Sequence, residues 1–468
     1  MRYAVGTPLL AGFAAVLAGA LLAPVSSHGA AARPEQAVVA VSPMVVSRFE
    51  QTGQPLSTAQ CEAQYHLACY QAPQLQVAYN LDPLFSRGIT GAGQTIVLVD
   101  SYGSPTIRHD LAVYDAQYGL PAPPSFKIIQ PAGPVPPFKK NSDFEGWAGE
   151  TTLDVEAAHT IAPGANILLV ETPVSETEGV TGFPQIVRAE NYVINHNLGD
   201  VISQSFGATE ETFPNAASVT ALRSAYANAA AHHVTVLAAT GDDGVTDTGL
   251  NEVTFYTHRV VDWPPSDPLV TAVGGTELHL DAAGNHTSPD TVWNDTYNHA
   301  QNELAYGDAG PNPDASNGGV SVLFTRPWYQ NGVASVVGNA RGVPDITMSA
   351  ACNGAIQNYQ SYPGSPAGWY LSCGTSEATP LFAGIVALAD QVAGHRLGLI
   401  NPALYAMKAH NAPGLVPVTS GNNTVTFTQN GHTYTIAGYR AKRGYNLASG
   451  LGTVNAALFV PALAAYAG

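Results

Sequence analysis

The chain has 468 residues, of which 45% are hydrophobic and 11% are charged, and its formal net charge at pH 7 is −17. This length and apolar content allow a large buried core and exclude a chain too polar to fold. No run rich in Lys or Arg offsets the negative charge, so the composition argues against a nucleic-acid partner and fits an acidic surface.

The N-terminus has a pattern typical of export. Arg2 is followed by an apolar stretch and then by small residues, which predicts a secretory signal peptide over residues 1–32, cleaved near Ala30 to Ala32. A retained membrane anchor is the alternative. No later apolar run is long enough to span a bilayer, so we expect a secreted protein with no membrane segment after cleavage. Residues 33–70 are polar and without clear periodicity, which predicts a short pro-segment or linker.

Four cysteines are consistent with export, because an even number in a secreted chain favours disulfides. Their proximity in the sequence predicts the pairs Cys61–Cys69 and Cys352–Cys373. A metal site is the alternative, and the lack of a Cys-x-x-Cys spacing disfavours it.

From residue 71 onwards, strands and helices alternate. Short runs rich in β-branched residues predict strands within 93–103, 165–172, 200–207, 234–244 and 269–276. Apolar residues at helical spacing predict helices within 106–120, 183–198 and 215–233. This alternation indicates an α/β fold with a mainly parallel central sheet covered by helices on both faces, and sites in such folds lie at the carboxyl ends of strands. Residues 276–370 are richer in Gly, Pro and Asn, and we expect them to be irregular.

The stretch "SCGTSEATP" at 372–380 contains a candidate nucleophile, Ser376, just before an apolar run at 381–389 that predicts a helix. Backbone amides at a helix N-terminus can stabilise an oxyanion. A serine hydroxyl is a poor nucleophile without a base, however, so the sequence must supply one.

Histidine is the usual base for a serine. His159 is the best placed of the 14 histidines, although it lacks the His-Gly-Thr sequence of a subtilisin-type triad. Asp100, at the end of the first predicted strand, could be the acid of such a triad. One hypothesis is therefore a catalytic triad of Asp100, His159 and Ser376. The other is that His159 lies on a helix face and has no catalytic role.

Carboxylates offer a second kind of base. Glu150 and Asp154 are four residues apart, which places both on one face of a predicted helix. If this face is exposed to solvent, the two carboxylates and Glu156 form an acidic surface without a catalytic role. Repulsion between the two carboxylates would then destabilise the helix by about 0.2–0.5 kcal/mol. Buried beside Ser376, the pair would share a proton, and Glu150 could accept the serine proton while Asp154 orients it.

A further carboxylate follows the predicted strand within 234–244, in the sequence "TGDDG". Asp242 or Asp243 could cap a turn there. Held protonated, one of them could instead donate a hydrogen bond to a tetrahedral oxyanion.

From about residue 70 to the C-terminus, these motifs resemble the sedolisins, or serine-carboxyl peptidases, which look like subtilisin with its histidine replaced. "GTSEATP" resembles the family's nucleophile loop, "GETTLD" its Glu/Asp helix, "TGDDG" its oxyanion loop, and "SQSFG" the edge strand that binds substrate backbone. "WPPSDPLVTAVGGT", "GGVSVLFTRPWYQ" and "RGVPDIT" also look like family sequence. The resemblance implies a subtilisin-like three-layer sandwich over 71–468. It also implies these roles: nucleophile Ser376, base Glu150, its partner Asp154, oxyanion donor Asp242, and substrate contacts at Ser205, Phe206 and Gly207.

The sequence departs from the family pattern at its calcium site. Family members have an Asp before "[Ile/Val]-Thr-Ser-Gly-Asn" and a later Gly-x-Gly-[Trp/Tyr]-Asp. Here Pro417 replaces the first aspartate, Lys442 the first glycine, and Asn446 the second aspartate. Because calcium prefers several charged oxygens and both carboxylates are missing, we expect calcium to be absent or weakly bound. We expect no other cofactor.

A second departure is the N-terminal segment, since 33–70 is too short for the large prodomain of typical members. The sequence as a whole predicts a secreted, monomeric peptidase that cleaves proteins or peptides at acidic pH, as an endopeptidase or a tripeptidyl-peptidase. The alternatives are a catalytically silent homologue that binds peptides and the peptidase based on His159. A paired-carboxylate glycosidase leaves Ser376 without a role.

Overall fold

The structure is a computed structural model that describes residues 53–307 and 309–467. The predicted signal peptide, residues 1–32, and the first part of the predicted pro-segment, residues 33–52, lie outside the described residues. Within the described ranges, no helix is both long enough and apolar enough to cross a membrane.

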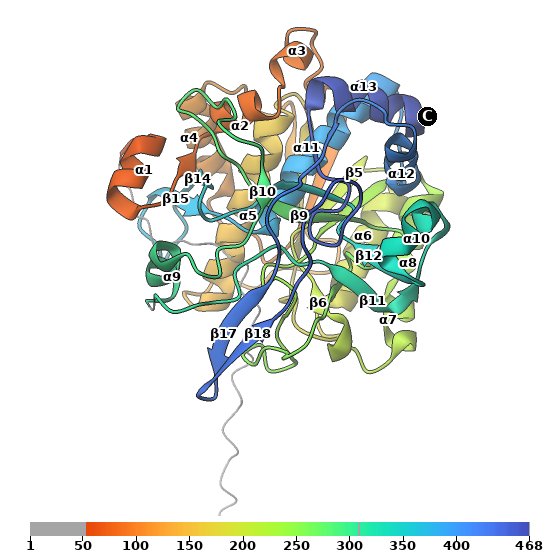
Figure 1. Ribbon diagram of the computed structural model, residues 1–468. Coiled ribbons are helices and arrows are strands. Elements are labelled where there is room, and N and C mark those ends of the chain that lie inside the picture. Colours follow the sequence, from red (N-terminus) through yellow and green to blue (C-terminus); the bar gives the residue numbers. More distant parts are fainter. Residues whose placement is uncertain (1–52, 308, 468) are drawn as a thin grey trace, which may run out of the picture. The chain divides into compact units, whose positions relative to one another are not determined.

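An eight-stranded sheet forms the centre of the fold (Figure 1). The strand order is β10-β9-β7-β5-β2-β4-β3, and β13 also pairs with β9. Every pair is parallel except β10–β9, so the prediction of a mainly parallel sheet is confirmed. The strands are β2 (Thr95–Ser101), β3 (Phe126–Ile129), β4 (Asn166–Thr172), β5 (Val201–Gln204), β7 (Thr235–Ala239), β9 (Thr271–Glu277), β10 (Thr291–Val292) and β13 (Ile346–Ser349).

Helices cover both faces of this sheet. Along β2, Ile96 and Leu98 pack into one core cluster, whereas Val97 and Val99 pack into another, which is why the strand reads as a continuous apolar run. The first cluster contains residues of α5 (Ser142–Ile161) and α11 (Thr375–Ala393). The second contains residues of α6 (Phe183–Asn195), α7 (Ala216–Leu222) and α8 (Ser224–Ala231). The three-layer sandwich is therefore confirmed.

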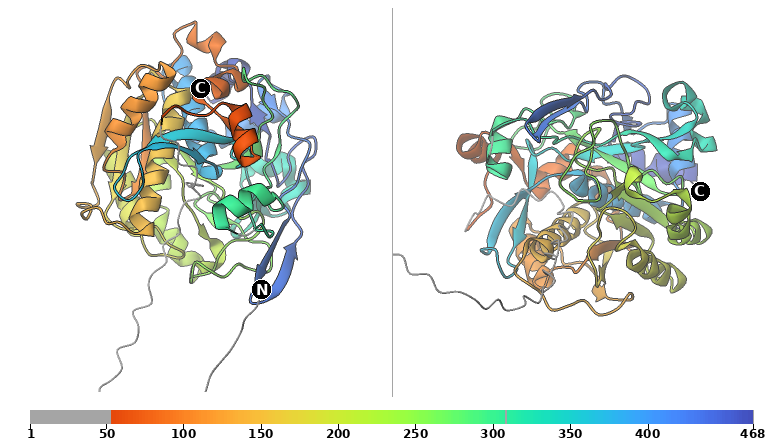
Figure 2. Two further views of the ribbon diagram at one scale, coloured as in Figure 1. Left: turned by 90° about the vertical axis from the view of Figure 1, so that its left-hand side faces the viewer. Right: turned by 90° about the horizontal axis from the view of Figure 1, so that it is seen from below.

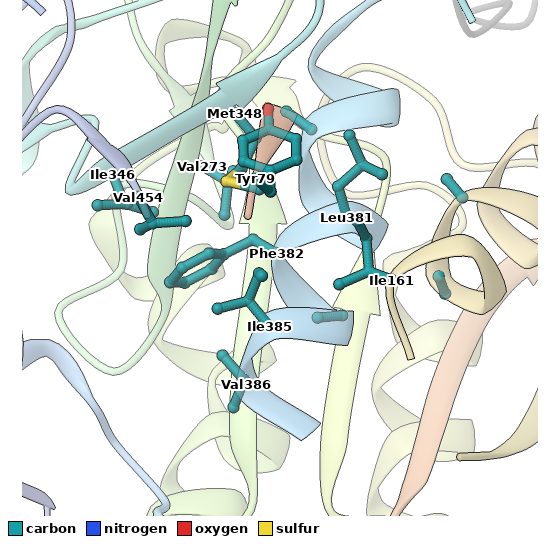
Figure 3. Close-up of a cluster of buried hydrophobic side chains, with 14 of the residues drawn as sticks. Tyr79, Ile161, Val273, Ile346, Met348, Leu381, Phe382, Ile385, Val386 and Val454 are labelled. Carbon is teal, nitrogen blue, oxygen red and sulfur yellow. The ribbon is translucent and has the colours of Figure 1, made fainter. Parts of the chain in front are cut away.

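The packing of α11 against α5 positions the polar side chains considered below. Leu381, Phe382, Ile385 and Val386 of α11 lie among buried residues of the sheet and of α5 (Figure 3). A Cβ atom on Gly384 would lie 2.6 Å from the Cβ atom of Ile161, so glycine at this position lets the two helices approach closely. Residues on α5 and on the first turn of α11 are thereby held at a fixed separation.

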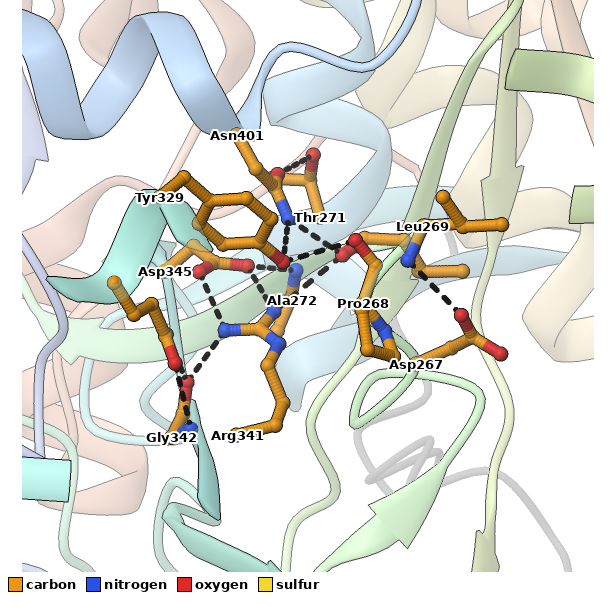
Figure 4. A network of polar contacts seen from close by, with 12 residues as sticks. Asp267, Pro268, Leu269, Thr271, Ala272, Tyr329, Arg341, Gly342, Asp345 and Asn401 are labelled. Atoms are coloured by element: carbon orange, nitrogen blue, oxygen red, sulfur yellow. Dashed lines mark hydrogen bonds and ion pairs between the residues drawn. The ribbon is translucent and has the colours of Figure 1, made fainter. Parts of the chain in front are cut away.

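A buried ion pair explains the motif "RGVPDIT". Arg341, in β12 (Ala340–Val343), donates to Asp345 through both terminal nitrogens, one of them at 2.7 Å, and both side chains are fully buried (Figure 4). Asp345 also accepts from the Ala272 backbone N–H at 2.9 Å and from the Tyr405 hydroxyl at 2.8 Å. These hydrogen bonds tie β9 to α12 (Asn401–Ala409) and β12.

Residues 53–70, the described part of the predicted pro-segment or linker, belong to the folded body. They form α1 (Thr58–Tyr65) and β1 (Cys69–Tyr70), and β1 pairs with β14 (Ala355–Gln360). Cys61, Leu67 and Cys69 are buried, and these contacts stabilise a segment whose own periodicity is weak. The predicted disulfides Cys61–Cys69 and Cys352–Cys373 are both present.

Two expectations need correction. Residues 276–370 are less irregular than predicted, because they contain β13 of the central sheet together with α9 (His299–Tyr306), β11 (Gly319–Thr325), β12, β14 and β15 (Gly368–Ser372). The helix predicted over 215–233 is interrupted at Arg223, whose guanidinium group binds the Asp267 carboxylate.

β17 (Val425–Gln429) and β18 (His432–Ile436) form a hairpin that projects from the fold (Figure 2).

Candidate active site

Ser376 lies in the first turn of α11 and is only 6% exposed. The residue before this helix, Gly374, has φ of 114°, a left-handed conformation that glycine adopts readily. A Cβ atom at Gly374 would also lie 2.5 Å from Asp242 Oδ2, so glycine lets that carboxyl group reach the start of α11. The first N–H groups of a helix have no intrahelical acceptor, which leaves the Ser376 N–H available to an anion.

Asp242 is bound to the residue that precedes the serine. Asp242 Oδ1 accepts from the Thr375 backbone N–H at 2.6 Å and from the Thr375 hydroxyl at 2.7 Å. Burial raises the pKa of Asp242 to about 6, although the Thr375 hydrogen bonds oppose the increase. The structure thus brings Asp242, rather than Asp243, to the loop that contains Ser376, and Asp243 interacts with Asp247 instead.

Glu150 and Asp154 lie on the buried side of α5. Their side chains and that of Glu156 are 0% exposed, so the solvated acidic face considered from the sequence is excluded. The Ser205 hydroxyl donates to Asp154 Oδ1 at 2.7 Å and lies 3.3 Å from the Ser376 carbonyl oxygen. Ser205 therefore links the α5 carboxyl groups to the start of α11.

Burial raises the pKa of Glu150 well above its usual range. The Ser376 hydroxyl lies beside Glu150 and offsets part of this increase, although neither carboxyl oxygen of Glu150 makes a close hydrogen bond. Burial also raises the pKa of Asp154, and the charges of Asp100 and Glu150 add to the increase. Burial raises the pKa of Asp100 to about 7.

None of the ion pairs in the described part of the chain involves Glu150, Asp154 or Asp100. Neighbouring buried carboxyl groups without a cation cannot all ionise together, so they share protons at acidic pH. The cluster of Glu150, Asp154 and Asp100 can therefore accept a proton from Ser376 only after the cluster has lost one of its own protons.

His159 lies elsewhere on α5. Its Nε2 atom is 2.8 Å from the Pro121 carbonyl oxygen and 3.2 Å from Asp115 Oδ1, and its Nδ1 atom has no hydrogen-bond partner. Asp100 interacts with Glu150 and Asp154 rather than with His159. The triad of Asp100, His159 and Ser376 is thus not assembled in the structure.

The segment 205–207 follows β5 and precedes β6 (Ala208–Thr209). β5 lies between β2 and β7, so the segment is not part of a sheet edge, as the resemblance implied, but extends beyond the end of an interior strand. Phe206 is 7% exposed and packs against Trp147 and Phe183. The Ser205 and Phe206 side chains therefore make contacts inside the protein, and substrate contacts at 205–207 stay a prediction.

Two side-chain contacts at this site were not predicted from the sequence. Thr375 holds Asp242 in place, and its position between Gly374 and Ser376 in the nucleophile motif was the available signal. The Ser205 side chain contacts Asp154, and no local pattern indicates this, because it depends on where β5 ends relative to α5.

Glu190 is a buried carboxyl group on the opposite face of the sheet, and it yields a prediction about stability. It lies on α6, is 1% exposed, and accepts a hydrogen bond from Gln204 Nε2. Burial raises the pKa of Glu190 to about 8, whereas an unfolded glutamate has a pKa of about 4.3. Between these two values the unfolded state releases a proton that the folded state keeps, so the folded state loses about 1.4 kcal/mol of stability per pH unit as pH rises.

We expect Glu190→Gln to remove this loss, since glutamine resembles the protonated acid and can still accept from Gln204. Chemical denaturation should give similar unfolding free energies for variant and wild type near pH 4, and an advantage of a few kcal/mol for the variant near pH 7. Glu303→Gln, at an exposed position, serves as the control. A constant difference between Glu190→Gln and wild type at all pH values would contradict the prediction.

Comparison with known proteins gives consistent similarities. A sequence model of the subtilase family matches residues 144–435. Kumamolisin from Bacillus sp. (strain MN-32) is 32% identical over 348 residues, which cover 73% of this chain and 56% of kumamolisin. Sedolisin from Pseudomonas sp. (strain 101) is 29% identical over 376 residues, which cover 80% of this chain and 58% of sedolisin. Human tripeptidyl-peptidase 1 is 29% identical over 296 residues, which cover 59% of this chain and 45% of that protein.

A solved structure, Pseudomonas sedolisin complexed with two molecules of pseudo-iodotyrostatin, superposes with a TM-score of 0.67 and 26% identity. The superposition covers 84% of this chain and 97% of the sedolisin chain. By contrast, the chain spans little more than half the length of the first two curated relatives, 56% and 58%.

Proposed function

Because the chain belongs to the subtilase family and is a homologue of the sedolisins, we propose that it is a serine-carboxyl peptidase that hydrolyses peptide bonds at acidic pH. The observation that carries the proposal is the placement of Ser376, at the N-terminus of α11, beside a buried glutamate and not beside a histidine.

In the proposed reaction, Ser376 Oγ attacks the carbonyl carbon of a peptide bond while Glu150 takes the hydroxyl proton. Asp154, oriented by Ser205, shares the proton that Glu150 gains. The Ser376 backbone N–H and the protonated Asp242 donate hydrogen bonds to the oxyanion. The proton on Glu150 then passes to the leaving amine, and water hydrolyses the acyl-enzyme by the reverse sequence.

This chemistry sets a pH window. Asp242 must be protonated to donate, and its pKa of about 6 means that the donor is lost as pH rises through that value. Above it, a carboxylate would also face the developing oxyanion and repel it. At the lowest pH, Glu150, Asp154 and Asp100 are all protonated, so Ser376 has no base and activity is lost. Activity should therefore be greatest at an acidic pH between this lower limit and the ionisation of Asp242, and it should decline towards neutrality.

We expect hydrolysis of a denatured protein, followed from pH 2 to pH 8, to peak in the acidic range with a descending limb near pH 6. The variant His159→Gln should keep this profile, because glutamine can still donate to the Pro121 carbonyl oxygen and His159 has no part in the reaction. A rate that instead rises through about pH 6.5, the usual pKa of histidine, and is lost in His159→Gln would replace this proposal with a histidine-based triad.

We further propose that the protein acts in an oxidising compartment outside the cytosol. Two disulfides and no free cysteine are present among the described residues, a cysteine usage typical of exported proteins.

A further inference from the structure

The loop 442–450 lies near the C-terminus, just before β19 (Thr453–Val454), and contains two of the positions at which the sedolisin resemblance implies calcium ligands. Within it, a bridge between Asn446 and Gly450, with backbone hydrogen bonds of 3.2 and 2.9 Å, closes the turn 446–450. The third position, Pro417, adjoins β16 (Leu415–Val416), which pairs with β19. All three positions thus belong to connected parts of the fold.

The Asn446 side chain occupies the centre of this loop and is 2% exposed. Its amide nitrogen donates to the Lys442 carbonyl oxygen at 3.1 Å and approaches the Gly444 carbonyl oxygen at 3.4 Å and the Ser449 hydroxyl at 3.0 Å. Its amide oxygen accepts from the backbone N–H groups of Ala448 at 3.1 Å and Ser449 at 3.0 Å. One uncharged side chain therefore satisfies backbone groups on both sides of the loop.

These contacts test whether calcium fits here. A hard cation needs inward-facing oxygens that are free to coordinate it. The carbonyl oxygens of Lys442 and Gly444 already face an N–H donor, whose hydrogens would repel a cation placed among them. Pro417 offers no side-chain oxygen, and the Ser449 hydroxyl lies 3.5 Å from the Val418 carbonyl oxygen as a further donor. The residues present do not fit a calcium ion.

We propose that the Asn446 side-chain amide takes the structural place of the family's calcium ion, and that it makes the C-terminal part of the fold independent of metal. The amide joins the carbonyl oxygens of the loop by donating hydrogen bonds to them, where a cation would join them by coordination. An amide stays neutral across the acidic range, whereas carboxylate ligands release metal when they become protonated. A metal-free loop therefore suits a protein that works in acid, a consequence that rests on the proposed function.

The test is thermal unfolding of the full chain, measured at pH 5 in excess EDTA, in buffer alone and in 10 mM calcium. We expect the wild-type Tm to agree in the three conditions. A wild-type Tm that falls in EDTA and is restored in a saturable manner by calcium would overturn the proposal. Because Tm is measured without substrate, the outcome does not depend on whether the protein is a peptidase.

A variant tests the role of the amide itself. Asn446→Asp keeps the size of the side chain but removes the two N–H hydrogens that face the Lys442 and Gly444 carbonyl oxygens, and the protonated acid can supply at most one O–H in their place. We expect its Tm in EDTA to fall by about 2–6 °C, because the Lys442 and Gly444 carbonyl oxygens lose hydrogen bonds from the amide. The matched control Asn430→Asp, at an exposed position in the β17–β18 turn, should leave Tm within about 1 °C. An Asn446→Asp variant as stable in EDTA as the wild type would show that the amide does not hold the loop.

Discussion

Replacing Ser376 by alanine is expected to lower kcat for peptide hydrolysis by roughly 10⁴-fold or more, because removal of a serine nucleophile leaves only binding and oxyanion stabilisation. Ser376 is 6% exposed and lies in the first turn of α11, where alanine fits without a clash. We therefore expect an unchanged fold and an unchanged Tm. Initial rates at the acidic optimum, measured beside a thermal melt, separate lost chemistry from lost structure.

Ser372→Ala is the matched control for this variant. Ser372 is also buried, lies four residues before Ser376 at the end of β15, and donates to the Asn358 side chain. Its loss should cost some stability and leave activity at the same pH largely intact. If Ser376→Ala kept more than about a tenth of the wild-type rate, a different nucleophile would have to carry the reaction.

Much of the fold could be predicted because its strands are buried on both faces. The run that forms β2 is apolar at consecutive positions, and such runs alternate with helical spacing along the chain, which together specify a parallel sheet between helices. The features that were not predicted lie where tertiary contacts outweigh local preference. The helix break at Arg223 coincides with its ion pair to Asp267, and α1 with β1 depends on a disulfide and on pairing with β14.

The candidate site could be predicted only in part. The spacing of Glu150 and Asp154 places them on one helical face, but spacing alone allows a solvated face, and burial follows from the packing of α5 against α11. The contact between Ser205 and Asp154 joins residues 51 positions apart, which no local pattern encodes. The same holds for Thr375 and Asp242, which are 133 positions apart in the sequence.

The second large effect is expected for Glu150→Gln. Glutamine has nearly the shape of glutamic acid and no charge, so it can fill the buried space on α5 but cannot take a proton from Ser376. General-base catalysis contributes roughly 10²–10⁴-fold, and we expect kcat to fall by a factor in this range while KM changes little. The residual rate should also lose the ascending acidic limb of the wild-type profile, because that limb reports the deprotonation that generates the base.

Glu156→Gln is the control that separates the role of a base from the general effect of a buried acid. Glu156 lies on the same helix, is equally buried, and has a pKa raised by burial, but it accepts from the Tyr359 backbone N–H instead of lying beside Ser376. Its replacement should preserve kcat and its pH dependence. Equal losses of kcat in the two variants would mean that replacing any buried acid of α5 impairs the enzyme through its fold. A loss of kcat confined to Glu150→Gln would identify Glu150 as the group that receives the serine proton.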